Sequence, residues 1–98
     1  MISLPNLHDA TLKSVNFDWV RGVVQLAFKT DVAFSSVIEA SEVTELKCPR
    51  LSPWGPSSSV NSVAHATLAY GHYMTVEMQS GDVLEIHCGK VSVLSASE

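Results

Sequence analysis

Residues 74–88 alternate apolar and polar side chains on both sides of a short segment that contains Gly81. A period of two residues is the pattern of a β-strand with one face in the core. A three-residue loop ending at Gly81 suits a residue in the left-handed region and predicts an antiparallel hairpin. A register centred on Gly81 would set Glu77 against Glu85, which like-charge repulsion disfavours. The predicted pairs are therefore Met78 and Asp82, Glu77 and Val83, Val76 and Leu84, Thr75 and Glu85, and Met74 and Ile86.

Residues 15–28 predict a second hairpin by the same alternation. A two-residue turn at Arg21-Gly22 would place all the large apolar side chains of both strands on one face, Trp19 included. A slip of one residue would move half of these side chains from the buried face into water, so the register is well specified. The predicted pairs are Val20 and Val23, Trp19 and Val24, Phe17 and Leu26, and Val15 and Phe28.

The middle of the chain predicts two further strands, Val32–Ala40 and Glu42–Cys48, with a break near Ser41. Near the C-terminus the apolar positions change from even to odd numbers at Gly89. We expect a bulge or corner there that turns the last strand or carries it into a second sheet.

Residues 59–70 fit two patterns. A helix would begin with Ser59 as its N-cap and end before Gly71. The content of Thr and Val favours a strand. In that strand, one face would carry Val60, Ala64, Ala66, Leu68 and Tyr70.

Together these elements predict an all-β fold of about seven short strands, an antiparallel β-sandwich or rolled barrel. The alternative is an α+β fold with one helix near residues 60–69. Ninety-eight residues suit a single domain over residues 1–98. A chain of this length buries roughly two-thirds of its unfolded surface.

Composition excludes several classes of protein. The net charge is −4 and the six Lys and Arg residues are scattered, so nucleic-acid binding is not expected. No apolar run approaches the length of a membrane span. The N-terminus lacks the pattern of a signal peptide, and the two cysteines, Cys48 and Cys88, lie in apolar strand patterns. We therefore expect a cytoplasmic protein with two buried, reduced thiols.

Charged residues make up only 16% of the chain, below the average of about 25%. A small domain has much surface to cover, so part of that surface should be buried against another molecule. A homodimer is the simplest form of such burial.

No catalytic or metal-binding pattern stands out. His8-Asp9 could form half of a catalytic pair, but adjacent residues more often close a turn. The serines at 57–59 lack a nucleophile motif. Glu77 and Glu85 are expected to be solvated residues on the polar face of a strand. His72 and His87 could lie close together across the 74–88 hairpin, but zinc needs three or four ligands. We expect no enzyme activity, no metal and no cofactor.

The segment Pro49–Asn61 holds three of the four prolines around Trp54. Proline removes backbone donors and fixes the chain in extended geometry, so this segment predicts a stiff loop. Trp54 would either close one end of the sandwich or anchor a partner. The predicted binding residues are Arg50, Pro53, Trp54 and Pro56.

Four short motifs carry a resemblance: Leu7-His8-Asp9-Ala10, Pro53-Trp54-Gly55-Pro56-Ser57, Ser59-Val60-Asn61 and Glu77-Met78-Gln79-Ser80-Gly81-Asp82. The chain resembles a family of small uncharacterised bacterial proteins, some of which are similar to the immunity protein 50 family of polymorphic toxin systems. The resemblance implies a bacterial, cytosolic, non-enzymatic protein. It implies no catalytic or binding residue.

Three functions follow as hypotheses. The first is a non-catalytic β-domain that works by protein–protein contact, with a toxin as a candidate partner of an immunity-type protein. The second is a small-ligand-binding domain with a pocket between the sheets, lined by Trp19, Phe28, Met74 and Met78. The third is an enzyme that uses His8, Asp9, Glu77 or Glu85.

Overall fold

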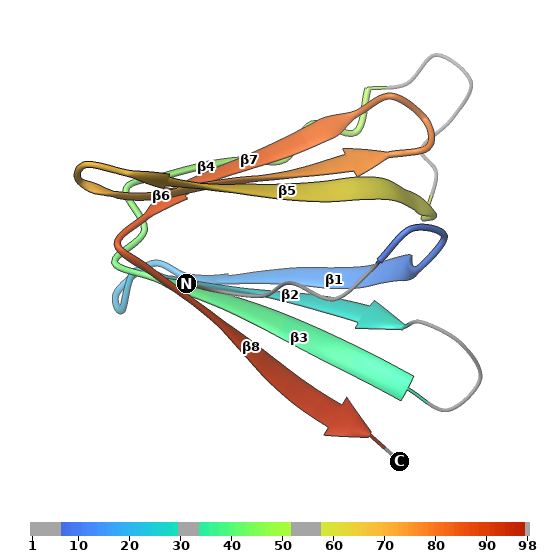
Figure 1. The fold of residues 1–98 in the computed structure, drawn as a ribbon, viewed down its shortest axis with the longest axis horizontal. Coiled ribbons are helices and arrows are strands. Elements are labelled where there is room, and N and C mark those ends of the chain that lie inside the picture. The colour runs from blue at the N-terminus through green and yellow to red at the C-terminus, as the bar shows by residue number, and fades with distance from the viewer. Residues whose placement is uncertain (1–6, 30–33, 52–57, 98) are drawn as a thin grey trace.

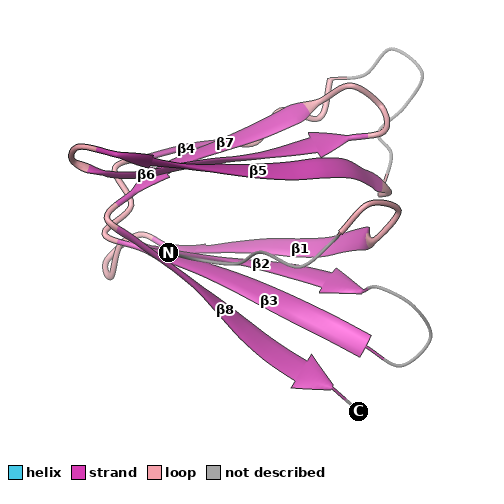
Figure 2. Ribbon diagram, viewed as in Figure 1, coloured by secondary structure: helices cyan, strands magenta, loops and turns pink. Residues whose placement is uncertain are grey.

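The fold is that of a computed structural model that describes residues 7–29, 34–51 and 58–97. The described residues form eight strands and no helix (Figure 2). The strands are β1 (Thr11–Asp18), β2 (Val23–Lys29), β3 (Phe34–Ser41), β4 (Glu45–Lys47), β5 (Val60–Leu68), β6 (Gly71–Met78), β7 (Val83–Cys88) and β8 (Lys90–Ser97).

The strands form two antiparallel sheets of four, in the orders β1-β2-β3-β8 and β4-β7-β6-β5. Figure 1 shows the two sheets one above the other, with the chain passing between them at the left of the view. The predicted all-β class is confirmed. The α+β alternative is wrong, because residues 60–68 form strand β5 along the edge of the second sheet.

Side chains at alternate positions of both sheets meet in one core, and the burial pattern of β2 shows this alternation most clearly. Val24, Leu26 and Phe28 have no exposed surface, whereas the residues between them are partly exposed. No polar or charged residue of the described chain is buried. Burial of apolar area at about 25 cal/mol per Å² is the main stabilising term of such a core. Its members are Leu7, Ala10, Val24, Leu26, Phe28, Ile38, Ala40, Val60, Met74, Val76, Met78, Leu84, Ile86, Cys88 and Val91.

The β6–β7 hairpin has the predicted register, with Met74 opposite Ile86 and Glu77 opposite Val83. Gly81 has a φ of 101° and closes the loop by donating its amide to the carbonyl of Met78. The apolar alternation and the requirement for a left-handed residue were therefore sufficient to predict this hairpin.

The turn between β1 and β2 differs from the prediction. It contains four residues, 19–22, and Phe17 lies opposite Val24. Asp18 sets this turn, since its carboxylate accepts the amide of Arg21 at 3.1 Å and its carbonyl accepts the amide of Gly22 at 2.9 Å. The observed register differs from the predicted one by two residues. Phe17 therefore stays on its predicted face of the sheet, but Trp19 lies in the turn. The predicted burial of Trp19 is wrong, because its side chain is 82% exposed.

The chain crosses between the sheets twice. One crossing joins β3 to β4 and the other joins β7 to β8 at Gly89, so the predicted break near Ser41 and the predicted corner at Gly89 are confirmed. The amide of Gly89 lies 3.1 Å from the carbonyl oxygens of both Ser41 and Glu42. The two crossings are thus hydrogen-bonded to each other.

A bulge at the start of β5 reverses its predicted faces. The register shifts between Val60 and Ser62, after which Val63 lies opposite Val76 and His65 opposite Met74. Odd-numbered residues therefore share the inner face beyond the bulge, and Ala64 is exposed. The extra residue of a β-bulge has this effect, because strand faces alternate with a period of two.

Candidate functional site

Large exposed apolar side chains gather at one end of the sandwich. Trp19 and Val20 on the β1–β2 turn are 82% and 92% exposed, and Tyr70 on the β5–β6 turn is 98% exposed. Phe17 and Leu68, the neighbouring strand residues, are partly exposed as well. We call these five residues the aromatic end. In Figure 1 both turns lie at the left, beside the crossings between the sheets.

Backbone contacts link the two turns to each other through the crossings between the sheets. The carbonyl of Gly22 accepts the amide of Val43 at 3.0 Å, which joins the β1–β2 turn to the first crossing. The first crossing bonds to Gly89, as described above. A methyl group added at Gly71 would lie 3.4 Å from the α-carbon of Gly89, so the β5–β6 turn packs against the second crossing.

Two open hollows lie at this end and share Thr44. One, of about 290 Å³, is bordered by Phe17 and Trp19, and the other, of about 420 Å³, by Leu68 and Tyr70. The rings of Phe17 and Trp19 meet edge to face with centroids 5.9 Å apart. Aromatic pairs of this geometry add about 0.5–1.5 kcal/mol beyond their burial, so Trp19 is partly held in place before any partner binds.

The charges around the aromatic end are paired with opposite charges. Arg21 lies 3.9 Å from the carboxylate of Asp18, and Lys90 lies 3.8 Å from that of Glu42. Glu45 faces both Lys47 and His87 at 3.8 Å. Exposed pairs such as these contribute about 0–1 kcal/mol each to stability. They leave this end with little net charge.

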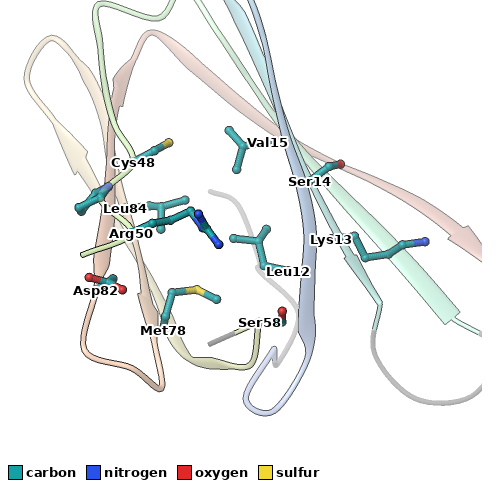
Figure 3. Close-up of a pocket in the computed structure, with 11 residues that line it drawn as sticks. Leu12, Lys13, Ser14, Val15, Cys48, Arg50, Ser58, Met78, Asp82 and Leu84 are labelled. Carbon is teal, nitrogen blue, oxygen red and sulfur yellow. The ribbon is translucent and has the colours of Figure 1, made fainter. Parts of the chain in front are cut away.

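A cavity of about 340 Å³ lies elsewhere, between β1 and the segment that follows β4. Arg50, one of the predicted binding residues, reaches into it (Figure 3). The other three, Pro53, Trp54 and Pro56, lie outside the described residues. The predicted lining of a pocket by Trp19, Phe28 and Met74 is wrong, since Phe28 and Met74 have no exposed surface and Trp19 is on a turn. Only Met78 of that set borders this cavity.

Among the residues of the enzyme hypothesis, His8 Nε2 lies 3.6 Å from the Asp9 carboxylate, and each of the four residues has a structural contact. Asp9 has a φ of 68° in the turn before β1, as expected for a turn residue, and accepts the side-chain amide of Gln79. His8 Nδ1 donates to the carbonyl of Asn61 at 2.7 Å. Glu77 accepts the Ser62 hydroxyl at 3.4 Å.

Glu85 has a different partner on the outer face of the second sheet. The hydroxyl of Tyr73 donates to Glu85 at 2.9 Å, and the Tyr73 ring lies 4.6 Å from that of His87. This hydrogen bond, followed by desolvation and the negative charge of Glu85, raises the pKa of Tyr73. A tyrosine held in its neutral form serves as a hydrogen-bond donor and is a poor general base.

The structure pairs His72 with His65 rather than with His87. His65 Nε2 lies 2.8 Å from His72 Nδ1, and the two rings lie nearly parallel with centroids 5.0 Å apart. The β5 register brings them together, and it could not be read from the sequence because of the bulge at residue 61. No group of three metal-ligating side chains occurs in the described ranges.

The two cysteines differ in exposure. Cys88 is buried, as predicted, whereas Cys48 is exposed and borders the 340 Å³ cavity. The prediction of two buried thiols is therefore wrong for Cys48, because β4 ends at Lys47 and the chain beyond it leaves the core. Desolvation raises the pKa of both thiols, so both are held in the protonated form.

Comparison with family models, with curated proteins and with solved structures found no match for this chain. The resemblance to the immunity protein 50 family therefore stays a prediction. The described residues include no helix with the length and hydrophobicity that crossing a bilayer would require.

Proposed function

We propose that this chain is a non-catalytic binding domain that works by protein–protein contact through the aromatic end. The observation that carries the proposal is the exposure of Trp19, Val20 and Tyr70 on two turns at the same end of the sandwich. Trp and Tyr are the residues most enriched at the centres of protein interfaces. Burying their side chains on a partner would recover hydrophobic free energy that the isolated chain forgoes.

The partner we propose is a second copy of this chain. The paired charges leave the aromatic end nearly neutral, so two copies would not repel each other there. The small share of charged residues, 16%, supports the same conclusion, because it leaves more apolar surface to be covered. A toxin domain, the partner that the resemblance implies, is the alternative occupant of the same surface.

Analytical ultracentrifugation over a range of protein concentrations tests this proposal. We expect a dimer for the native chain and a shift toward monomer for Trp19→Ala and for Tyr70→Ala. Leu94→Ala is the matched control, since Leu94 is also exposed but lies on the outer face of β8. It should leave the dimer unchanged.

Two outcomes would contradict the proposal in different ways. A native chain that stays monomeric at the highest concentration excludes the second copy as the partner. If a purified toxin domain then binds the native chain but not Trp19→Ala, the aromatic end serves the alternative occupant. If neither self-association nor toxin binding changes in Trp19→Ala and Tyr70→Ala, the aromatic end is not the contact surface.

A further inference from the structure

We infer that the 340 Å³ cavity between β1 and the segment after β4 binds a small amphipathic carboxylate. Its apolar body would lie in the cavity and its carboxylate on the guanidinium of Arg50. The inference is independent of the aromatic end, because the lining residues of this cavity and of that surface do not overlap.

Apolar residues from both sheets line the cavity, beside the polar or charged residues Lys13, Ser14, Arg50, Ser58 and Asp82. Leu12 and Val15 of β1 face Met78 and Leu84, at the adjoining ends of β6 and β7 (Figure 3). Its volume lies at the lower end of the range of ligand sites, roughly 300–1,000 Å³. Apolar walls with few polar groups are typical of sites that bind the body of a small molecule.

Arg50 is the polar group that orients such a ligand. Its side chain extends between the two walls, past Leu84 toward Leu12 (Figure 3). No carboxylate in the described chain lies within ion-pair distance of Arg50, whereas Arg21, Lys47 and Lys90 each have one. A guanidinium binds a carboxylate through two parallel hydrogen bonds, so Arg50 favours this class of anion.

The backbone beside Arg50 is held in place by Asp82. One oxygen of the Asp82 carboxylate accepts the amide of Leu51 at 3.0 Å, and the other accepts the hydroxyl of Ser80 at 2.9 Å. These hydrogen bonds fix the direction from which Arg50 enters the cavity. They also occupy both oxygens of the carboxylate that borders the cavity, which weakens its competition with an incoming anion.

Binding of octanoate, followed by amide chemical shifts in ¹H–¹⁵N spectra, tests the inference. We expect saturable shifts at Leu12, Val15 and Leu84. Octylamine and octan-1-ol carry the same apolar chain without the carboxylate and should bind more weakly. Hydrogen bonds to a charged group contribute about 1.5–3 kcal/mol, so Arg50→Gln should raise the Kd by about tenfold or more.

Lys13→Gln is the matched control for charge. Lys13 also borders the cavity, but its side chain points away from it (Figure 3). The substitution removes the same charge from the same region and should change the Kd less than about twofold. Cys48 gives an independent readout, because bound octanoate should slow alkylation of this exposed thiol at the cavity. Trp19→Ala should leave octanoate binding unchanged, since Trp19 does not border the cavity.

Three results would overturn the inference. The first is the absence of octanoate shifts at millimolar concentration. The second is an equal loss of affinity in Arg50→Gln and Lys13→Gln, which would indicate attraction by net charge alone. The third is equally tight binding of octan-1-ol, which would leave Arg50 without a role. Circular dichroism of Arg50→Gln should show an intact fold, since Arg50 is exposed.

Discussion

The amide nitrogen of Gly89 lies 3.1 Å from the carbonyl oxygen of Glu42, which ties the two crossings between the sheets to each other. Glu42 itself has a φ of 55°, a left-handed conformation that is costly for a residue with a side chain. Gly89 faces it so closely that an added methyl group would lie 2.9 Å from the β-carbon of Glu42. The absence of a side chain at residue 89 therefore lets the crossings meet.

Gly89→Ala should lower the free energy of unfolding by about 1–3 kcal/mol, the usual cost of forcing an extra carbon into a packed site. Gly89 does not have a positive φ, so the cost comes from the contact with Glu42 rather than from backbone strain. Urea denaturation of the two proteins measures the difference.

A double-mutant cycle isolates that contact. Glu42→Gly removes the opposing β-carbon and suits the positive φ of that position. In the Glu42→Gly background, Gly89→Ala should cost less than half as much as in the native chain. Equal costs in both backgrounds would show that the two residues do not limit each other.

The parts of the fold predicted best from sequence are those in which local pattern and turn chemistry agree. In the β6–β7 hairpin, the apolar alternation and Gly81 select the same register. At Gly89, the change of parity along the sequence matches the change of sheet. In both cases a glycine at a defined position determines the local path of the backbone.

Two errors have different causes, an extra residue in β5 that shifts parity and a longer β1–β2 turn that shifts the register by two residues. The bulge at residue 61 moved His65 to the inner face of β5, so its contact with His72 was not foreseen. At the β1–β2 turn, the carboxylate of Asp18 selected a four-residue turn over the expected shorter one. Trp19, the centre of the aromatic end, was missed for that reason.

Two phenylalanines of the β1–β2 hairpin provide a matched test of the observed register. Phe28 has no exposed surface, whereas Phe17 is 39% exposed at the aromatic end. Phe28→Ala should lower the free energy of unfolding by about 3–5 kcal/mol, the usual cost of truncating a buried phenylalanine. Phe17→Ala should cost less than half of that. Equal losses in urea denaturation would contradict the four-residue turn.

Glu85→Gln should lower the pKa of Tyr73, because it removes the carboxylate that accepts the tyrosine hydroxyl and the negative charge that opposes its ionisation. Absorbance at 295 nm measures the titration, in a Tyr70→Phe background that leaves Tyr73 as the only tyrosine. Glu77→Gln is the control, since Glu77 bonds to Ser62 instead. An unchanged Tyr73 titration in Glu85→Gln would contradict the hydrogen bond.

The His65–His72 pair should make the protein less stable in mild acid. Burial lowers the pKa of His65, and the charge of a protonated His72 lowers it further. In the unfolded chain His65 titrates near its ordinary pKa of about 6.5. As the pH falls below that value, the unfolded state takes up a proton that the native state does not, and stability is lost until the lower native pKa is reached.

Urea denaturation at pH 7.5 and pH 5.5 measures this loss. The loss of stability should be smaller in His65→Gln, because the titrating group is absent. His87→Gln is the control and should lose as much stability as the native chain, because His87 lies on the outer face beside Tyr73. His72→Gln should raise the pKa of His65 by removing the neighbouring charge, which the Cε1 proton resonance of His65 reports. If the native chain loses no more stability than His65→Gln does, folding does not lower the pKa of His65 and the prediction is wrong.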